Sequence, residues 1–348
     1  MLRVGIVGLG GISRSHGDAI ETLPNVEIVA AADLLDAPRQ AFCDRYEVPR
    51  AYPNHTELIK DDEVDAVAVT LGHQLHHRLT VDALNAGKHV LVEKPMALSL
   101  QQCDDMIEAA RRNNVKLMVG LTQHFLGPNM KAKQILDSGE LGPLITAVCY
   151  SVKNWGYPNR RPQYRSRFHG GGYWMTNGVH MVDRLTWLVG SQAARVKARI
   201  GTKSHYQAGD DYGVAFVDYK NGVPGIAIAI GYRDGAPNYQ SEIICANGGV
   251  RFSGSGDRFV AIGRGNEWTR VPFEDPPAGM TAEWRAFARS IEEDLEPPTS
   301  GEWGRHIMEI LFAAERSSIT GQQVTLASGS LYTVQTTGQV VSQEHGWV

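Results

Sequence analysis

The sequence lacks the features that mark membrane, nucleic-acid-binding and disulfide-stabilised proteins. No stretch reaches the roughly 18 consecutive apolar residues that a membrane span needs, so we expect no membrane partner. A formal net charge of −4 lacks the basic excess of a nucleic-acid binder. The four cysteines lie far apart and form no C-x-x-C pair, which indicates reduced thiols (Cys43, Cys103, Cys149 and Cys245).

Signals for export and for metal binding are also missing. A strand-like run begins directly after Met1, so we expect no signal peptide and a cytoplasmic protein. His73, His76 and His77 have a spacing that metal sites use. However, no cysteine or carboxylate accompanies them and H-E-x-x-H is absent, so we predict no metal.

The order of strand-like and helix-like runs predicts two domains in the 348 residues. Such runs alternate through residues 1–121, which predicts a doubly wound parallel sheet; residues 52–58 read as a loop and a short helix. From 122 to 327, most strands follow one another directly and two helices come last. This pattern predicts an α/β domain with a large open, mainly antiparallel sheet. Residues 328–348 are polar and read as a tail.

A glycine-rich stretch near the start carries the clearest functional signal. The first apolar run ends at Val7, and Gly8, Gly10 and Gly11 precede a helix-compatible segment that begins near Ser13. Glycine permits the backbone angle of a tight turn and lets the main chain approach a ligand. The N–H groups of the following helix would then face a pyrophosphate.

A second apolar run, 26–32, ends on Asp33, at the offset where an acid meets the ribose hydroxyls of a dinucleotide. Asp33 would repel a 2′-phosphate, and the nearest basic residue is Arg39. The pattern therefore favours NAD over NADP. The alternative is a glycine-rich turn in an unrelated α/β protein.

Two later stretches supply candidate catalytic groups. Lys94 follows the strand-like run 88–92, and the carboxyl end of such a strand borders the ligand crevice, where an ammonium can stabilise a developing alkoxide. His180 is a candidate acid/base and shares a helix face with Thr176 and Asp183 by i, i+4, i+7 spacing. The alternatives are a surface lysine and a histidine bonded into the domain interface.

These motifs together resemble the glucose–fructose oxidoreductase / inositol dehydrogenase / MocA family over nearly the whole chain. The matching pieces are G-x-G-x-x-S-x-x-H at the start, Asp33, Glu93-Lys94-Pro95, and G-G-G-x(7)-H-x-x-D from Gly170. The resemblance implies a Rossmann domain, a second domain with a large open sheet, and oxidation or reduction of sugars, polyols and related secondary alcohols with NAD(P).

The resemblance also implies roles for individual residues. Lys94 would be the catalytic lysine and His180 the acid/base. The implied cofactor contacts are Gly8, Gly10, Gly11, Ile12, Asp33, Thr70, Leu71, His76, Glu93, Lys94 and Gln123.

Two positions depart from the family pattern. Many members carry an Asp four residues before the catalytic histidine, where this chain has Thr176. A threonine hydroxyl can bond to the substrate or the imidazole but brings no charge. Members that resemble phthalate dihydrodiol dehydrogenases carry a small hydroxyl residue and an amide at these positions, and Thr176-Asn177 looks similar. The second departure is Leu71-Gly72, where Pro-Asn is more usual.

An aromatic and arginine-rich loop at 153–175 is the candidate substrate contact. Aromatic faces stack on sugar rings or arenes, and arginine forks fit carboxylate, phosphate or sulfonate. The candidate substrate-binding residues are Lys94, Trp155, Tyr157, Arg165, Thr176, Asn177 and His180. A solvated loop is the alternative. An anionic substrate would be an acidic sugar, a glycoside with an acidic or aromatic aglycone, or a carboxylated dihydrodiol.

The sequence therefore predicts an NAD-dependent oxidoreductase that acts on a secondary alcohol of a sugar, polyol or glycoside. One alternative is an NAD-retaining enzyme that cleaves glycosides by oxidation and elimination. Another is a dihydrodiol dehydrogenase of a carboxylated aromatic, and a third is a dinucleotide-sensing regulator, which would be expected to lack Lys94 or His180. We expect a homodimer or homotetramer.

Overall fold

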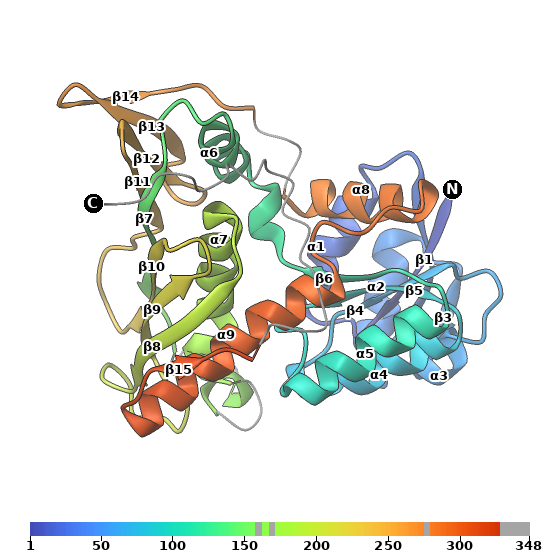
Figure 1. Cartoon of the computed structure of the whole chain (residues 1–348). Coiled ribbons are helices and arrows are strands. Elements are labelled where there is room, and N and C mark those ends of the chain that lie inside the picture. The colour runs from blue at the N-terminus through green and yellow to red at the C-terminus, as the bar shows by residue number, and fades with distance from the viewer. Residues whose placement is uncertain (157–161, 167–170, 275–278, 328–348) are drawn as a thin grey trace.

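A computed structural model describes residues 1–156, 162–166, 171–274 and 279–327 and contains two sheets (Figure 1). The first has six parallel strands in the order β3-β2-β1-β4-β5-β6. Its strands are β1 (Leu2–Val7), β2 (Val26–Ala32), β3 (Arg50–Tyr52), β4 (Ala66–Val69), β5 (His89–Glu93) and β6 (Leu117–Gly120). Its helices are α1 (Gly11–Ile20), α2 (Asp36–Tyr46), α3 (His55–Leu58), α4 (His76–Asn85) and α5 (Leu100–Arg112), with 3₁₀ turns η1 (His73–Leu75) and η2 (Thr122–Phe125).

The strand order of this sheet confirms the predicted doubly wound fold. It reverses between β1 and β4, and ligands of such sheets bind outside the carboxyl ends of the strands at this switch point. The buried β4 reads Ala-Val-Ala-Val, as expected of a strand covered on both faces. The loop predicted around Tyr52 is instead the edge strand β3, which at three residues is too short to show a period.

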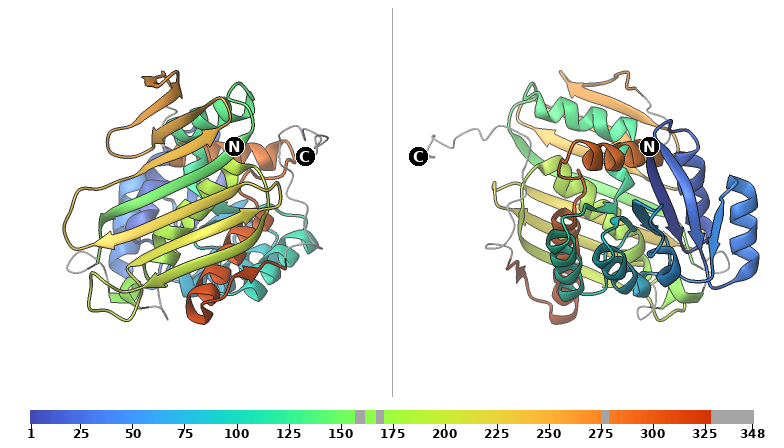
Figure 2. Two further views of the ribbon diagram at one scale, coloured as in Figure 1. Left: turned by 60° about the vertical axis from the view of Figure 1, so that its left-hand side comes forward. Right: turned by 90° about the vertical axis from the view of Figure 1, so that its right-hand side faces the viewer.

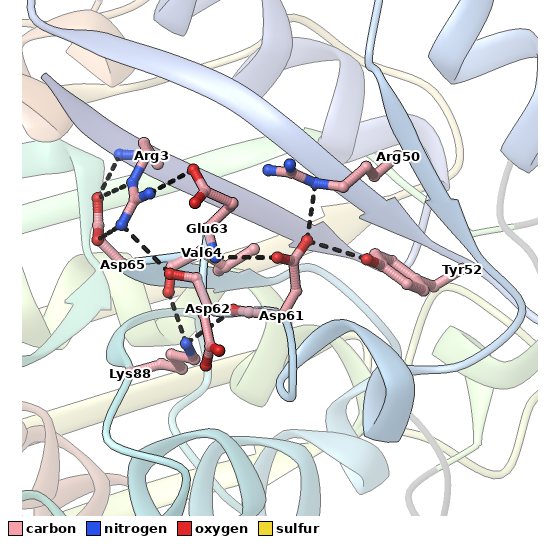
Figure 3. Close-up of polar contacts among 9 residues, drawn as sticks. All are labelled: Arg3, Arg50, Tyr52, Asp61, Asp62, Glu63, Val64, Asp65 and Lys88. Carbon is pink, nitrogen blue, oxygen red and sulfur yellow. Dashed lines mark hydrogen bonds and ion pairs between the residues drawn. The ribbon is translucent and has the colours of Figure 1, made fainter.

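Polar contacts tie the strands together at the opposite, amino-terminal edge (Figure 3). Arg3, in β1, donates to the Asp65 carboxylate at 2.9 and 2.6 Å just before β4. Lys88, just before β5, donates to the carbonyls of Asp61 and Val64 at 2.9 and 2.7 Å. Three neighbouring strand starts are thus held by one acidic turn, far from the ligand edge.

The second sheet is mixed and mostly antiparallel, in the order β14-β13-β12-β11-β7-β10-β9-β8-β15, with one parallel pair, β7 and β10. Its strands are β7 (Leu144–Asn154), β8 (Ala193–Gly201), β9 (Tyr212–Tyr219), β10 (Pro224–Tyr232), β11 (Gln240–Cys245), β12 (Gly248–Ser253), β13 (Phe259–Arg264), β14 (Glu267–Arg270) and β15 (Val324–Thr325). The sequence analysis missed β15, a two-residue pairing with β8. The predicted open, mainly antiparallel sheet is confirmed.

Helices lie on only one face of this sheet, and the other face is bare among the described residues (Figure 2). The remaining helices are α6 (Gly127–Asp137), α7 (Val179–Val189), α8 (Gly279–Glu292) and α9 (Gly301–Thr320), with a 3₁₀ turn η3 (Pro162–Arg165) and a π-helical turn η4 (Trp174–Gly178). Among the described residues, none of the helices is long and apolar enough to cross a membrane.

The last helices return to the first sheet (Figure 1). Val119 donates its backbone N–H to Thr299 at 2.8 Å, just before α9. Trp284, in α8, donates its indole N–H to Nδ1 of His16 in α1 at 3.0 Å. The chain therefore crosses between the two sheets more than once, which fixes the space between them.

Candidate active site

The glycine-rich turn after β1 has the shape that a dinucleotide needs. Gly8 has φ +94°, and a Cβ there would lie 2.3 Å from Cγ of Leu71, so only glycine fits. Gly10 precedes α1 without a side-chain cap, and a Cβ on Gly10 or Gly11 would meet no atom within 4 Å. The first N–H groups of α1 thus face open space that suits a pyrophosphate, next to the partly exposed Ile12.

Asp33 lies at the carboxyl end of β2 and is held against this turn. Its carboxylate accepts from the backbone N–H groups of Leu9 at 2.8 Å and Leu35 at 2.9 Å. Arg39 donates to the Asp33 carbonyl at 2.7 Å and pairs with the Asp36 carboxylate. Arg39 is the nearest basic residue that could bind a 2′-phosphate, and these two contacts already engage its guanidinium. This arrangement favours NAD over NADP.

Thr70 and His76 hold the neighbouring loops. The Thr70 hydroxyl donates to the carbonyls of Gly8 at 2.5 Å and Val7 at 3.1 Å. The His76 ring lies between the carbonyls of Pro95, at 2.8 Å, and Leu71, at 3.1 Å. Burial lowers the pKa of His76, and a neutral ring can donate to only one carbonyl at a time. Their contact with the cofactor stays a prediction.

Glu93 is buried at the end of β5 and is oriented by α1. Nε2 of His16 lies 3.2 Å from its Oε1, and the backbone N–H of Lys94 donates to Oε2 at 3.2 Å. Burial alone would raise the pKa of Glu93, but the hydrogen bond from His16 and the charge of Lys94 leave it below the ordinary value. His16 is the last position of the motif at the start of the chain, and sequence reasoning gave it no role.

A cavity of about 300 Å³ lies beside the end of β5. It brings together five predicted residues, Lys94, Gln123, Thr176, Asn177 and His180, from both halves of the chain. Lys94 precedes a cis peptide bond to Pro95, and its ammonium donates to the Thr176 carbonyl at 3.1 Å. The other lining residues are Ser151, Lys153, Met181, Arg184, Tyr239 and Ser255.

His180 is the second residue of α7 and lines this cavity. Burial, and then the charges of Lys94, Lys153 and Arg184, lower its pKa well below the ordinary value. Its Nδ1 is buried without a hydrogen-bond partner among the described residues, as is Nδ2 of Asn177. A neutral imidazole beside an ammonium can take a proton from a hydroxyl, and the unpartnered groups indicate a missing ligand.

The helix face differs from the predicted one. Asn177, His180, Met181 and Arg184 line the cavity, because 3.6 residues per turn place 184 closer to 180 around the helix than 183. Asp183 instead accepts from Trp303 Nε1 at 2.7 Å and lies 2.8 Å from Nε2 of His124 (distances to Oδ1). The Thr176 hydroxyl donates to the Gly172 carbonyl within the preceding turns, so its side chain is partly committed to backbone.

Trp155 and Arg165, two of the residues predicted for substrate binding, do not line this cavity. Trp155 is buried, with its ring centroid 5.2 Å from that of Tyr173 and 6.3 Å from that of His205, and it does not line the cavity. Arg165, in η3, is also outside the lining. Tyr157 lies outside the described residues. The aromatic and arginine content of this loop predicted a substrate contact. Instead, the Trp155 ring packs into the protein interior against Tyr173 and His205, away from the cavity.

Sequence reasoning missed Ser151, Met181, Arg184, Tyr239 and Ser255 in the lining. Arg184 follows His180 by one helical turn, a spacing that could have identified it. Ser151 and Lys153 alternate along β7, a strand signal for one shared face. Across the described part of the chain, no group of three or more histidine, cysteine or acidic side chains is arranged to hold a metal.

Comparison with known proteins gives two family matches. The model described as an oxidoreductase family with an NAD-binding Rossmann fold (Gfo/Idh/MocA) matches residues 2–121. The model of the Gfo/Idh/MocA C-terminal domain matches residues 129–251.

Individual proteins are similar over most or part of the chain. Myo-inositol 2-dehydrogenase of Thermotoga maritima is 24% identical, over 91% of this chain and 96% of its own. A 1-carboxy-3-chloro-3,4-dihydroxycyclohexa-1,5-diene dehydrogenase of Comamonas testosteroni is 29% identical, over 66% and 58%. An Agrobacterium radiobacter oxidoreductase, solved with NAD⁺, L-tartaric acid and magnesium, shares the fold with a TM-score of 0.85 at 19% identity, over 93% and 98%.

Proposed function

Since this chain belongs to the Gfo/Idh/MocA family of NAD-binding oxidoreductases, which acts on CH–OH groups, we propose that it transfers a hydride between NAD and a secondary alcohol or ketone of a sugar, polyol or glycoside. One observation carries the proposal: Lys94 and His180 line the same cavity beside the end of β5. The glycine turn and Asp33 lie at the carboxyl ends of the same sheet, so a dinucleotide bound there can extend toward this cavity.

Each residue has a definite task in this mechanism. NAD, when bound, supplies the hydride acceptor. The Lys94 ammonium polarises the substrate oxygen and stabilises its developing negative charge. Neutral His180 accepts the hydroxyl proton, and Asn177 donates its free amide N–H groups to neighbouring substrate oxygens.

The names of the relatives support a polyhydroxylated substrate, and two of them are also consistent with an acidic one. One relative is named for a cyclic polyol and another for a carboxylated diol, and a structural neighbour was solved with tartaric acid. The carboxylated dihydrodiol is therefore our second candidate, and the Thr176-Asn177 pair and the basic cavity favour it.

Replacing Lys94 tests the mechanism. Lys94→Ala removes the ammonium at the substrate oxygen, so we expect kcat to fall about 10²- to 10³-fold while NAD binding persists. NADH absorbance would be followed across sugars, sugar acids, polyols and dihydrodiols, and calorimetry would follow NAD binding. The exposed Lys60→Ala is the matched control. Near-normal turnover by Lys94→Ala would contradict the mechanism.

Mass spectrometry of the purified protein separates free exchange of NAD from permanent retention. Retained NAD, together with release of an aglycone without net NADH, would favour the glycoside-cleaving alternative over a simple dehydrogenase.

A further inference from the structure

Arg184 is a buried cation that pairs with no acidic side chain in the described part of the chain. Its side chain is only 2% exposed. The Nη atoms donate to Oε1 of Gln123 at 3.3 Å, to the Tyr150 carbonyl at 3.1 Å and to Sδ of Met181 at 3.1 Å. These three acceptors are neutral, and Nε is buried without a partner. The guanidinium lies over the Phe252 ring, at 5.6 Å from its centroid, so an apolar surface covers its other side.

The described lining of the cavity around Arg184 is basic. Lys94, Lys153 and Arg184 all line it, and no aspartate or glutamate is among the described lining residues. Asp183, the nearest acid in sequence, faces away toward His124 and Trp303.

Among the described residues, two further buried acids near this site are bonded to other groups than Arg184 or to none: Glu93 is held by His16 and the Lys94 backbone N–H, and Glu283 makes no hydrogen bond. Glu283 is fully buried with both carboxyl oxygens unpartnered. Burial, and then the charges of Glu93 and Asp183, raise its pKa well above the ordinary value, so its ionised form is disfavoured. A buried charge without a counter-charge is destabilising by several kcal/mol unless something compensates it. A bound ligand anion would supply the negative charge that balances the Arg184 guanidinium.

We propose that Arg184 and Lys153 bind a carboxylate of the substrate while Lys94 and His180 act on its hydroxyl group. This inference rests on the proposed function, because it places the anion relative to the reacting alcohol. Four residues of α7 separate His180 from Arg184, a rise of roughly 6 Å. The carboxylate therefore lies only a few bonds from the alcohol, as in a sugar acid or a carboxylated cyclic diol. Arginine fits the planar carboxylate better than lysine, since its fork donates two parallel hydrogen bonds.

Matched acid and neutral ligands test the inference on the NAD-loaded protein. Calorimetry would compare D-gluconate with D-glucitol and D-glucuronate with D-glucose, because each pair differs in one carboxylate. D-Glucitol 6-phosphate adds a distant phosphate. We expect at least one acid to bind about 10- to 100-fold tighter than its neutral partner. Equal binding within every pair, or a preference for the phosphate, would overturn the inference.

Variants assign any preference to the two cations. Arg184→Gln should reduce the preference for the acid to about twofold or less, and Arg184→Lys, which keeps the charge but loses the fork, should retain part of it. Lys153→Gln, on the rim of the cavity, provides the test if Arg184→Gln does not fold. Arg289→Gln is the matched control, because Arg289 is exposed on α8 and pairs with Glu293. An undiminished preference in Arg184→Gln and Lys153→Gln would overturn the assignment.

Failure of this inference is distinguishable from failure of the proposed function. Lys94-dependent oxidation of neutral polyols, without preference for acids, would remove the carboxylate site and keep the oxidoreductase. Acid-selective binding that depends on Arg184, without NADH formation from any alcohol, would keep the carboxylate site and remove the proposed reaction.

Discussion

Glu93 and Lys94 are neighbours in the chain, yet they meet different surroundings. The Glu93 carboxylate turns inward to His16 at 3.2 Å, while the Lys94 ammonium reaches across to the Thr176 carbonyl at 3.1 Å. Alternate side chains at a strand end point to opposite sides, so one residue anchors the strand and the next enters the cavity. The sequence placed Lys94 at the ligand crevice, but it gave no sign that the neighbouring Glu93 is held by His16 in α1.

His180 predicts a pH profile for alcohol oxidation. The ring must be neutral to accept a proton, and its pKa in the folded protein lies well below the usual value of about 6.5. Protonation, and hence loss of rate, therefore begins only when the pH falls below about 6.5. We expect kcat/KM to stay flat from there up to neutral pH. An acid limb centred above 7 would contradict a neutral His180, and His180→Asn should abolish this limb.

Gly8 and Gly10 should respond differently to alanine. At Gly8 a Cβ meets Leu71 at 2.3 Å with φ +94°, so Gly8→Ala should lower the free energy of unfolding by about 1–3 kcal/mol. At Gly10 a Cβ meets nothing within 4 Å, so Gly10→Ala should fold normally and instead weaken NAD binding. Urea unfolding and calorimetry measure the two effects. Equal stability of both variants would contradict this division of roles.

At the scale of elements, regular caps and periods were predictable. Serine is a preferred N-cap residue, and the Ser99 hydroxyl accepts from the Gln102 N–H at 3.2 Å before α5. The three-residue β3 and the π-helical turn η4 were not predicted. A short edge strand has no measurable period, and an extra residue per turn depends on what packs around the turn.

The strand starts in Figure 3 predict an acid-sensitive edge of the first sheet. The hydrogen bond from Arg3 is the main cause that lowers the pKa of Asp65, despite its partial burial. The stabilisation is therefore present above the unfolded pKa of about 3.9 and is lost as the pH falls through the lower folded value.

Arg3→Gln should lower the free energy of unfolding at pH 7 by a small amount, because both side chains are about one-third exposed and solvent screens the pair. The difference from wild type should shrink toward zero in strong acid. Urea titrations across pH measure it, with Arg270→Gln, in an exposed pair with Asp257, as control. A difference that stays constant with pH would point to packing instead of charge.

At the scale of the whole molecule, the bare face of the second sheet supports the proposed homodimer or homotetramer. Along β9, Val214 and Phe216 are exposed while Ala215 and Val217 are buried beneath the helices, so both faces are apolar. Apolar side chains exposed on a sheet face that no described helix covers indicate an interaction site.

Light scattering should find an oligomer, and Phe216→Glu should shift it toward monomer, because the new charge would be desolvated on assembly. Ile319→Glu, at an exposed position on α9, is the control. A monomeric wild-type protein at micromolar concentration would contradict the proposal.

The sequence by itself determined the parallel and mixed sheets, the glycine turn, Asp33, and the pair Lys94 and His180. These features are local: a period, a turn or a short motif specifies each one. Only the tertiary structure decided that Lys94 and His180 share one cavity, that Arg184 enters it, and that Trp155 does not. These outcomes depend on the orientation in which α7 packs against β7 and on which aromatic rings are buried. Packing between segments that are distant in the sequence sets the helix orientation and the ring burial, and no local sequence pattern encodes this packing.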